Sequence, residues 1–403
     1  MSCKNLQKTL HMNTTNPLPS RALFAALPFS EKAMLSYRGV SPAARRWLLG
    51  FLTGLDANEK KVHVFGHQIA PFFPKGPLIP GDSNNIIGSY PALLLRYLNL
   101  WPFRWRSLTH SYKNGIDRVV TEWGRFDYVF SYNPWPNQLA MGRYIKGKDS
   151  ATKWILITLD YEDPDKDFET FLRITKGVDY YVFLSQWAYD NIPIKNKFLL
   201  EGGVKSELIQ RRYELQCGTI KKKFSQTKPA ILYTGMFDKW GGLSVLIEAF
   251  LDLPGDVELW ICGFGDDAYI RSALAKDARI KLYGLVSDEK LNKLSEGASL
   301  FVNPRPVNTN GNMMNFPSKI LEYLTYCKPV VSTLTPGLLN EYKNVCYIVD
   351  SEPSSMREGI IEALAEDQKK LLDVASDIHH FLQEKTWERQ IKKLLLWIDT
   401  LKT

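Results

Sequence analysis

Short apolar runs alternate with amphipathic segments from about residue 229 onward, and this alternation constrains the fold more than any other feature of the sequence. The apolar runs predict strands at residues 230–234, 257–262, 280–283, 300–303, 329–333 and 346–349. The segments between them predict helices at residues 243–251, 267–275, 288–296, 318–326 and 356–365. Strands joined by helices of this length connect by right-handed crossovers. We therefore expect an α/β fold class, with a Rossmann-like doubly wound sheet in this half.

The N-terminal half has the same kind of alternation, with longer helices and loops. Its strand candidates are residues 22–28, 61–65, 128–132, 154–159 and 180–184. A chain of 403 residues is long enough for two domains of roughly 200 residues each. The prediction is a Rossmann-like domain at residues 1–205, a second at residues 206–380, and a C-terminal segment at residues 381–403 whose helix packs back on the first domain.

A net charge of +8 and an isoelectric point near 9.0 favour a polyanionic partner. Phosphates on a small molecule, an anionic membrane face and a nucleic acid all fit, and charge alone does not choose among them. The sequence has no apolar run of the roughly 18 residues that a membrane span needs, and no secretory signal at its start. We expect a cytoplasmic protein. The five scattered cysteines include no C-x-x-C pair, so no metal site is expected.

The most informative stretch is NPRPVNTNGNMMNFPSKILEYLTYCKPVVST, residues 303–333. A loop rich in Asn and Gly leads to Pro317, which favours the first turn of a helix. Free amides at a helix start attract a phosphate, and Ser318 and Lys319 add a hydroxyl and a cation there. Glu322 follows further along the helix, where its carboxylate could accept hydrogen bonds from both hydroxyls of a ribose. Together these features indicate a nucleotide diphosphate site.

The alternative is that Lys319 and Glu322 form an ordinary solvated pair on a helix that merely packs on the core. Two neighbouring loops favour the ligand site. Gly235 and Lys239 follow the first strand of this half, at the end where doubly wound sheets bind ligands. Gly263 follows the next strand, where a missing side chain would let a base or ribose approach the backbone. Ordinary turns also use such glycines and lysines.

These residues resemble a known family. The ordered set TGMFDKWGG, LWICGFGDD, LYGLVSDEKL, LFVNPR and FPSKILEYLTYCKPVVST is similar to the nucleotide-sugar-binding domain of family 4 glycosyltransferases, which have the GT-B fold of two Rossmann-like domains facing a cleft. The resemblance is close over about residues 229–350. Residues 183–204, FLSQWAYDN followed by KFLLEGGV, are similar to the family's last N-domain strand and its interdomain link. Before about residue 150 the match is architectural only.

The resemblance implies that Glu322 holds the donor ribose. It also implies a set of groups around the diphosphate: the loop Met314, Asn315, Phe316 and Pro317, with Ser318, Lys319 and Lys239. Lys239 would then take part in catalysis by stabilising the leaving group. Family members are typically retaining enzymes that use a UDP- or GDP-sugar as co-substrate and need no bound metal, so no cofactor is expected.

Three positions depart from the family pattern. Met314 stands where many members have a second glutamate, which leaves open the group that faces the transferred sugar. Met236 replaces a common arginine after the first loop glycine, and Arg305 is a candidate to supply that charge. Cys327 replaces a helix-ending glycine, and we expect it to change the local geometry rather than the chemistry.

The N-terminal domain is expected to supply the acceptor site and any acid/base group. Arg38 and Gly39 precede a predicted helix, where family members bring a loop near the diphosphate. His67 and Asp160 follow strands, and either could steer an acceptor hydroxyl as a catalytic residue. Each of these residues has a plain alternative as a turn or capping residue.

The stretch LNLWPFRWRSLTHSYK, residues 98–113, alternates aromatic and basic side chains. Trp101, Phe103 and Trp105 with flanking Arg104 and Arg106 would suit a membrane interface. A lipid-linked saccharide acceptor would then be within reach, at the inner face of a membrane. The alternative is a buried aromatic cluster with a few surface arginines.

The leading hypothesis is a hexosyltransferase-type enzyme that moves a sugar from a nucleotide diphosphate to a saccharide acceptor in cell-surface polysaccharide biosynthesis. Under this hypothesis Glu322→Ala and Lys319→Ala should each lose most turnover while folding normally. One alternative, prompted by Met314 and Met236, is a non-catalytic nucleotide-sugar sensor or scaffold with the same fold. Sugar transfer to nucleic acid is a third hypothesis, prompted by the charge alone, and no nucleic-acid partner is expected.

Overall fold

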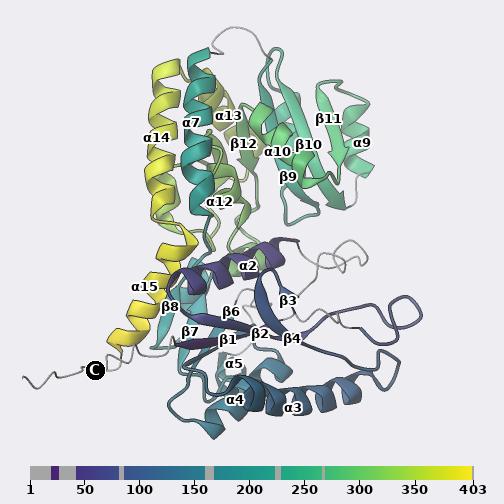
Figure 1. The fold of residues 1–403 in the computed structure, drawn as a ribbon. Helices are drawn as coiled ribbons and strands as arrows, with labels where there is room; N and C mark the ends of the chain where they lie inside the picture. Colours follow the sequence, from purple (N-terminus) through teal and green to yellow (C-terminus); the bar gives the residue numbers. More distant parts are fainter. Residues whose placement is uncertain are drawn as a thin grey trace, which may run out of the picture.

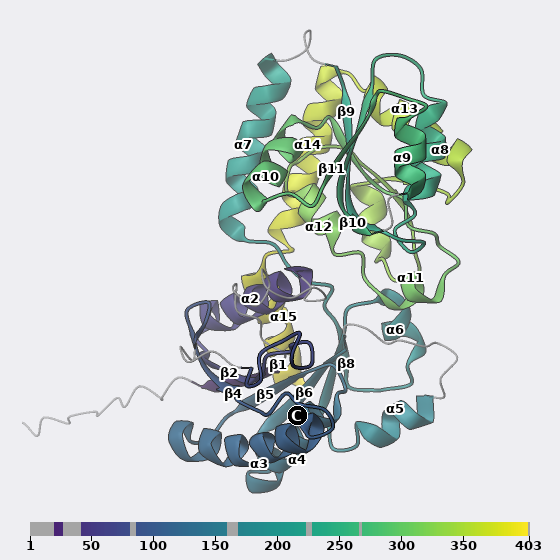
Figure 2. The same cartoon turned by 90° about the vertical axis from the view of Figure 1, so that its right-hand side faces the viewer.

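The protein consists of two α/β domains stacked one above the other, joined on one side by two crossings of the chain (Figures 1 and 2). The computed structural model describes residues 20–26, 42–80, 86–158, 168–222, 228–265 and 268–401. Each domain is built on one sheet with helices on both faces. The predicted fold class, two Rossmann-like doubly wound domains, is confirmed.

The N-terminal sheet has the strand order β3-β4-β2-β1-β5-β6-β7-β8, parallel except that β3 runs antiparallel to β4. Its strands are β1 (Arg21–Ala26), β2 (Lys61–His67), β3 (Ile86–Ile87), β4 (Tyr90–Leu95), β5 (Tyr128–Tyr132), β6 (Lys153–Thr158), β7 (Tyr180–Phe183) and β8 (Lys197–Leu199). Its helices are α2 (Pro42–Ala57), α3 (Arg104–Trp123), α4 (Pro136–Lys148), α5 (Phe168–Ile174) and α6 (Gln186–Asn191). Helices α3 and α4 cover the face away from the C-terminal domain, whereas α2 lies between the domains (Figure 1).

The C-terminal sheet has the strand order β11-β10-β9-β12-β13-β14 and is parallel throughout. Its strands are β9 (Ala230–Phe237), β10 (Glu258–Gly265), β11 (Ile280–Gly284), β12 (Leu300–Asn303), β13 (Val330–Thr333) and β14 (Tyr347–Val349). Its helices are α7 (Ser206–Lys222), α8 (Leu243–Leu251), α9 (Ala268–Leu274), α10 (Asp288–Gly297), α11 (Asn310–Met314), α12 (Lys319–Leu324), α13 (Pro353–Ala365) and α14 (Gln368–Gln383), with a short 3₁₀ helix at Asn340–Asn344. The strand order reverses between β9 and β12, which is the place where open sheets of this kind bind ligands.

The chain crosses between the domains before α7 and again after α14, and the two crossings are bonded to each other. The Val204 amide donates to the Lys385 carbonyl at 2.9 Å, and the Trp387 amide donates to the Val204 carbonyl at 3.1 Å. Helix α15 (Trp387–Thr400) then runs back along the N-terminal domain and packs against α2. A Cβ atom at Gly50 of α2 would collide with the Trp387 indole, so glycine permits this close helix contact.

The structure contains elements that the sequence patterns did not indicate. The short strands β3, β4 and β8 lie at the two edges of the N-terminal sheet, and α14 lies beside α7 on the C-terminal domain. Helix α7 occupies a basic, polar stretch in which the sequence pattern predicts no helix. Helix α12 is six residues long, and Pro317 lies before its N-cap residue Ser318 rather than in its first turn. The prediction that Pro317 starts this helix is therefore wrong by two positions.

Candidate functional site

Lys319 extends to Thr234, in the second half of β9. Its ammonium group donates to the carbonyl oxygen of Thr234 and lies 6.0 Å from the centre of the Tyr233 ring. A Cβ atom at Gly235 would lie 2.9 Å from the Lys319 Nζ and against the Tyr233 hydroxyl. Gly235 therefore makes the room that this lysine needs, and places its charge at the reversal in strand order.

Arg305 brings a second cation to the same place, because it follows β12, the other strand at the reversal. Its Nη1 donates to the Asn312 side-chain oxygen at 3.3 Å. Among the described residues, no carboxylate lies within ion-pairing distance of Arg305 or Lys319. The two basic side chains share a largely dehydrated region without a paired negative charge.

The pKa values of Lys319 and Arg305 are lowered by this lack of water and of a negatively charged partner. Burial, and after it the charge of the neighbouring Arg305, lowers the pKa of Lys319 to about 8, and Glu322 offsets only part of this lowering. Burial also lowers the pKa of the Arg305 guanidinium, although that group stays charged. Two desolvated cations that repel each other form a site prepared for an anion.

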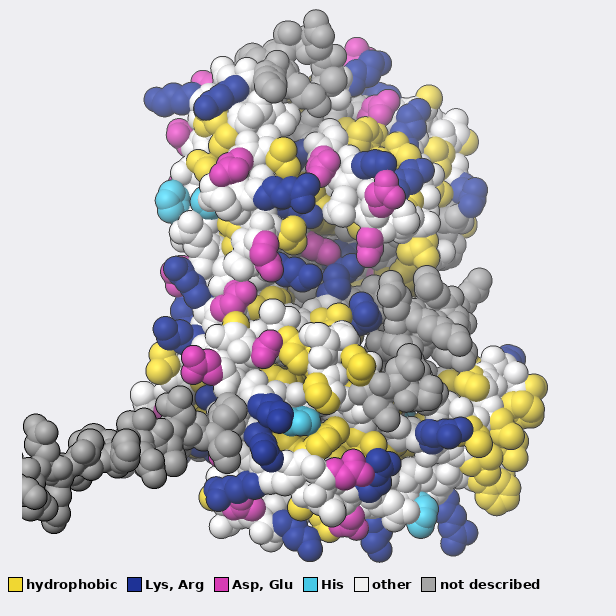
Figure 3. Space-filling model, in the orientation of Figure 1, with side chains coloured by type: hydrophobic (Ala, Val, Ile, Leu, Met, Phe, Trp, Pro, Cys, Tyr) yellow, Lys and Arg dark blue, Asp and Glu magenta, His cyan; other side chains and the backbone are white. Residues whose placement is uncertain are grey.

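Glu322 lies on α12, one turn beyond Lys319, and is paired across the domain boundary. Arg46 of α2 in the N-terminal domain approaches its Oε1 with Nη2 at 3.3 Å, and both side chains are about half exposed. Arg46 also lowers the pKa of Lys319, so it lies close to the cation pair as well. Figure 3 shows basic and acidic side chains gathered at the hollow between the two domains.

The loop from Met314 to Ser318 connects α11 to α12 and carries the other predicted donor residues. Met314, Phe316 and Pro317 are buried, and Phe316 packs against the Tyr342 ring at 5.7 Å. Ser318 is exposed at the N-cap position, and its side chain makes no capping bond to α12. The Asn315 Oδ1 is buried and accepts no hydrogen bond from the described residues. This loop is therefore a packed backbone turn, with Ser318 as its exposed polar side chain.

The structure separates Lys239 from this arrangement. Lys239 is exposed in the β9–α8 loop, and its ammonium group stacks on the Trp240 ring at 4.6 Å. Asp238 fixes the loop by accepting from the Trp240 and Gly241 amides at 3.0 and 2.8 Å. Gly263 has a φ of +146°, and a Cβ atom there would collide with the Gly235 carbonyl of the adjacent strand. Its missing side chain accommodates the neighbouring strand rather than leaving open space for a ligand.

Cys327 keeps the turn that a glycine would make at the end of α12. Its φ is +52°, in the left-handed region, and its amide donates to the Leu324 carbonyl at 2.8 Å. The expected change in local geometry is therefore absent at this position.

The candidate residues of the N-terminal domain do not join the cation pair within the described part of the chain. His67 ends β2 and is buried on the α3 side, where its Nδ1 lies 2.9 Å from the Tyr112 hydroxyl. Burial, and after it the charge of Arg104, lowers the pKa of His67 to about 4, so its ring is neutral at pH 7. Asp160, Arg38 and Gly39 lie outside the described residues.

Sequence reasoning missed Arg46 as a site residue. It stands in SPAARRWLLGFL, where two arginines precede a run of apolar residues near the start of a helix. That pattern indicates an amphipathic helix with basic residues near its N-terminal end, which is unfavourable for the helix dipole. A cation placed against this preference is a signal for an anionic partner, here Glu322.

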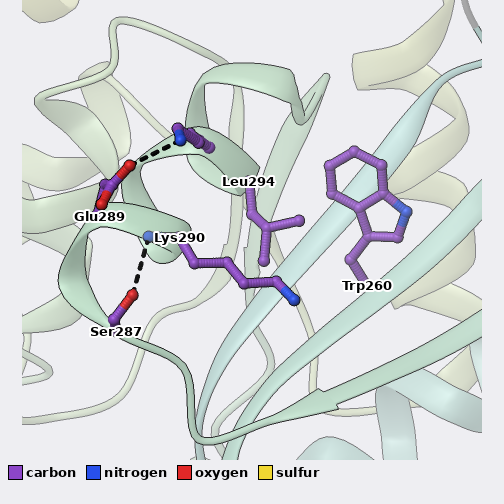
Figure 4. Close-up of a pocket in the computed structure, with 6 residues that line it drawn as sticks. Trp260, Ser287, Glu289, Lys290 and Leu294 are labelled. Carbon is purple, nitrogen blue, oxygen red and sulfur yellow. Dashed lines mark hydrogen bonds and ion pairs between the residues drawn. The ribbon is translucent and has the colours of Figure 1, made fainter.

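A separate hollow of about 400 Å³ lies between α10 and β10 (Figure 4). It is lined by Trp260, Ser287, Glu289, Lys290, Lys293 and Leu294. Ser287 caps α10 by accepting from the Lys290 amide, and Lys293 pairs with Glu289 at 2.7 Å. None of the predicted site residues lines this hollow.

No group of three or more His, Cys, Asp or Glu side chains is placed to hold a metal ion within the described residues. No helix there is long and apolar enough to cross a membrane.

Comparisons with known proteins agree with this arrangement. Residues 228–366 match the family described as glycosyl transferases group 1. An uncharacterised glycosyltransferase of Methanocaldococcus jannaschii is 24% identical over an alignment of 242 positions, which covers 55% of this chain and 58% of that protein. The chain thus matches less than two thirds of the length of that curated relative.

Two solved structures have the same overall fold. A glycosyltransferase from Rickettsia africae has a TM-score of 0.67 at 15% identity, covering 95% of this chain and 99% of that one. Anabaena HepE, solved in complex with UDP-glucose, has a TM-score of 0.61 at 14% identity, covering 93% and 99%. The predicted GT-B fold is confirmed, and residues 228–366 of the C-terminal domain carry the similarity to group 1 glycosyl transferases.

Proposed function

We propose that the protein is an enzyme that transfers a sugar from a nucleotide-diphosphate sugar to a saccharide acceptor, with retention at the transferred carbon. The observation that carries this proposal is the cation pair, Lys319 and Arg305, at the strand-order reversal of the C-terminal sheet. A diphosphate would supply the negative charge that this desolvated pair lacks, through charge-assisted hydrogen bonds. The group 1 match over the same domain supports the assignment.

Glu322 is the proposed ribose ligand. Its carboxylate is half exposed one turn beyond Lys319, so a nucleoside attached to a diphosphate on the cation pair would pass close to it. The ribose hydroxyls would donate to this carboxylate in place of Arg46. Arg46 would then be free to turn toward the diphosphate and close the site from the N-terminal domain.

We propose a UDP-sugar as the donor, because the HepE structure of the same fold holds UDP-glucose. A GDP-sugar is the other candidate. In this proposal Ser318 and the backbone amides of the loop at Met314, Asn315 and Phe316 complete the diphosphate site, and Gly235 makes room for Lys319 beside it. Lys239 would have to leave the Trp240 ring to join them.

Catalysis in this proposal rests on stabilising the leaving diphosphate. Lys319 and Arg305 lie in a region of low dielectric, where preorganised charges act more strongly than in water. These side chains do the neutralising that a metal ion does elsewhere, so we propose that no metal is needed. Asp160, or the loop at Arg38 and Gly39, remains the proposed source of groups facing the acceptor.

The proposed acceptor is a lipid-linked saccharide, used in building a cell-surface polysaccharide at the inner, cytoplasmic face of a membrane. The aromatic and basic residues from Trp101 to Arg106 support this choice, because such residues suit a lipid–water interface.

Thermal-shift screening against UDP, UDP-glucose, GDP and GDP-mannose tests the donor site. A ligand at 100 times its Kd stabilises the folded protein by roughly 2.7 kcal/mol. We expect one nucleotide series to raise the Tm of the wild type, and Lys319→Ala and Glu322→Ala to lose that shift while folding normally. Lys281→Met, an exposed lysine of the same domain, is the control that keeps it. Donor hydrolysis and sugar transfer at wild-type rates in both site variants would refute the proposal.

A second candidate function is a nucleotide-sugar sensor or scaffold without turnover. It is favoured by Met314, which is 2% exposed and places a buried apolar side chain where the family resemblance implies a carboxylate. Tight donor binding by calorimetry, with no sugar released or transferred to lipid extracts, would select this candidate over the enzyme.

A further inference from the structure

Part of the N-terminal domain exposes large apolar side chains in a compact group. We call it the aromatic surface and define it as Phe73, Leu78, Ile79, Trp101, Phe103 and Trp105. Trp101 is 70% exposed, Trp105 58% and Phe103 53%. Figure 3 shows hydrophobic side chains projecting together from the lower right edge of the molecule, in the lower domain. The alternative of a buried aromatic cluster is therefore wrong for these three residues.

Hydrogen bonds connect the two segments of the chain that carry the aromatic surface. Asn99 is fully buried and ties the two segments together, donating its side-chain amide to the Pro77 carbonyl at 2.9 Å and also to that of Pro71. The Phe73 amide donates to the Asn99 carbonyl at 3.1 Å, and the Asn99 amide donates to the Leu78 carbonyl at 2.8 Å. The backbone holds these side chains outward, so their exposure is built into the fold.

Positive charge lies beneath and around these aromatic rings. Arg104 is buried, with its guanidinium 4.5 Å from the Phe72 ring centre and 5.4 Å from the Trp105 ring centre. Its Nε has no hydrogen-bond partner among the described residues. Exposed Lys75, Arg96 and Arg106 add to this charge. In contrast, Asp82 is the single carboxylate in the sequence between Lys60 and Asp117.

From these observations we infer that the aromatic surface docks on an anionic lipid bilayer. Indole rings favour the boundary between headgroups and hydrocarbon, and exposed basic residues near an anionic surface are attracted to it. Because carboxylates are nearly absent from this region, an anionic surface meets little repulsion. Binding to a protein partner or to a second copy of the chain would not require basic residues with so few carboxylates around the aromatic surface. Docking itself is independent of sugar transfer, whereas its use in reaching a lipid-linked acceptor rests on the proposed function.

Co-sedimentation of the full-length protein with vesicles tests this inference. We expect binding to vesicles of phosphatidylcholine with 30% phosphatidylglycerol to exceed binding to pure phosphatidylcholine at least about tenfold, and to fall when the salt is raised from 0.05 to 0.5 M. The variant Trp101→Ser/Phe103→Ser/Trp105→Ser should lose most of this binding, and Lys75→Glu/Arg106→Glu should lose the preference for anionic vesicles. Leu215→Ser/Leu396→Ser, which changes two exposed leucines elsewhere, is the matched control and should bind as the wild type does.

A nucleotide thermal shift in the same variants separates docking from the donor site. If the serine variant keeps the nucleotide response and loses the vesicles, the inference holds even if no sugar is transferred. Equal vesicle binding by the serine variant and the wild type would overturn it. So would a concentration-dependent dimer in sedimentation velocity that the serine substitutions abolish, in a protein that does not bind vesicles.

Discussion

Two buried lysines, one at the proposed donor site and one at the interdomain connection, have opposite electrostatic surroundings. Lys385 lies where the chain crosses back to the N-terminal domain and pairs with both Glu201 and Glu341. Burial alone would lower the pKa of Lys385, but the two carboxylates outweigh it and raise that pKa. Lys319 has no such partner among the residues that the structure describes, and burial together with Arg305 lowers its pKa to about 8.

This comparison indicates that the charge of Lys385 stabilises the fold, whereas the charge of Lys319 serves to bind a ligand. Lys385 joins three segments that are distant in sequence, and Glu201, at 2% exposure, depends on it for neutralisation. Lys328 is a third lysine with little exposure, and its ammonium group donates to the carbonyls of Ser295, Glu296 and Ala298. In contrast to Lys385, Lys319 is repelled by a neighbouring cation. A side chain that lowers the stability of the fold points to a role in binding a ligand.

The largest expected effect on stability is at the interdomain connection. Lys385→Met leaves Glu201 buried without its partner, and breaking a buried pair in this way costs about 3–5 kcal/mol. Urea unfolding followed by tryptophan fluorescence measures the loss. Lys205→Met, an exposed lysine beside the same connection, should change stability by less than about 0.5 kcal/mol. An unchanged midpoint for Lys385→Met would show that these carboxylates do not need the ammonium group.

The opposite result is expected at the donor site. Lys319→Met removes a desolvated charge that Arg305 repels, so the Tm should stay the same or rise. Donor turnover should fall about 10²–10³-fold, as when one preorganised group that stabilises transition-state charge is removed. Differential scanning fluorimetry and a donor hydrolysis assay on the same preparation give both readings. A lower Tm with unchanged turnover would assign Lys319 to the fold, like Lys385.

Much of the C-terminal domain could be predicted from the sequence because its signals are local. Its strands and helices follow from apolar periodicity, and helix α8 has the predicted bounds. Lys319 and Glu322 could be proposed because spacing on one helix fixes their relation to each other. Helix α12 itself was harder to delimit, since the chain leaves the helical pattern within two turns and ends at Cys327 in a left-handed conformation.

Features that depend on distant segments could not be predicted with the same success. The sequence predicts both Lys239 and Lys319 as diphosphate ligands, and only packing shows that one stacks on Trp240 while the other reaches the Thr234 carbonyl. The Arg46–Glu322 pair joins two domains, so no local pattern contains it. The edge strands β3 and β4 were hidden because Pro91 and a continuous apolar run obscure the period-2 alternation of a strand.

The lowered pKa of Lys319 predicts a pH dependence for nucleotide binding. In the free protein Lys319 loses its proton near pH 8, whereas a bound diphosphate favours the protonated form. Affinity for UDP should therefore fall as the pH rises from 7.5 to 9.5, a range in which the phosphates are already fully ionised. Titration calorimetry at several pH values measures this, and binding near pH 8.5 should take up protons from the buffer. Lys319→Arg, which stays charged throughout, should flatten the curve; an equally steep curve would assign the titration to another group.

The same pKa sets the sign of a stability effect that Lys385 does not share. A lysine with a folded pKa below its unfolded value binds fewer protons when folded between those two values. The contribution of Lys319 to the free energy of unfolding should therefore become more favourable to the folded state between about pH 8 and pH 10.5. The difference in stability between Lys319→Met and the wild type should shrink over this range. Lys385, with its raised pKa, should lose its contribution only at higher pH.

The smallest effect is expected at the pair that links the two domains. Arg46 and Glu322 are both about half exposed, so Arg46→Gln should change stability by less than about 1 kcal/mol. If Arg46 turns from Glu322 to the diphosphate when the domains close on the donor, kcat should fall about tenfold while the Kd for UDP changes less than threefold. Arg118→Gln, which breaks an exposed pair with Glu122 on α3, controls for the loss of a surface charge. A weaker Kd for UDP with an unchanged kcat would give the opposite assignment. Arg46 would then contribute to donor binding before the domains close, and not to turnover in the closed state.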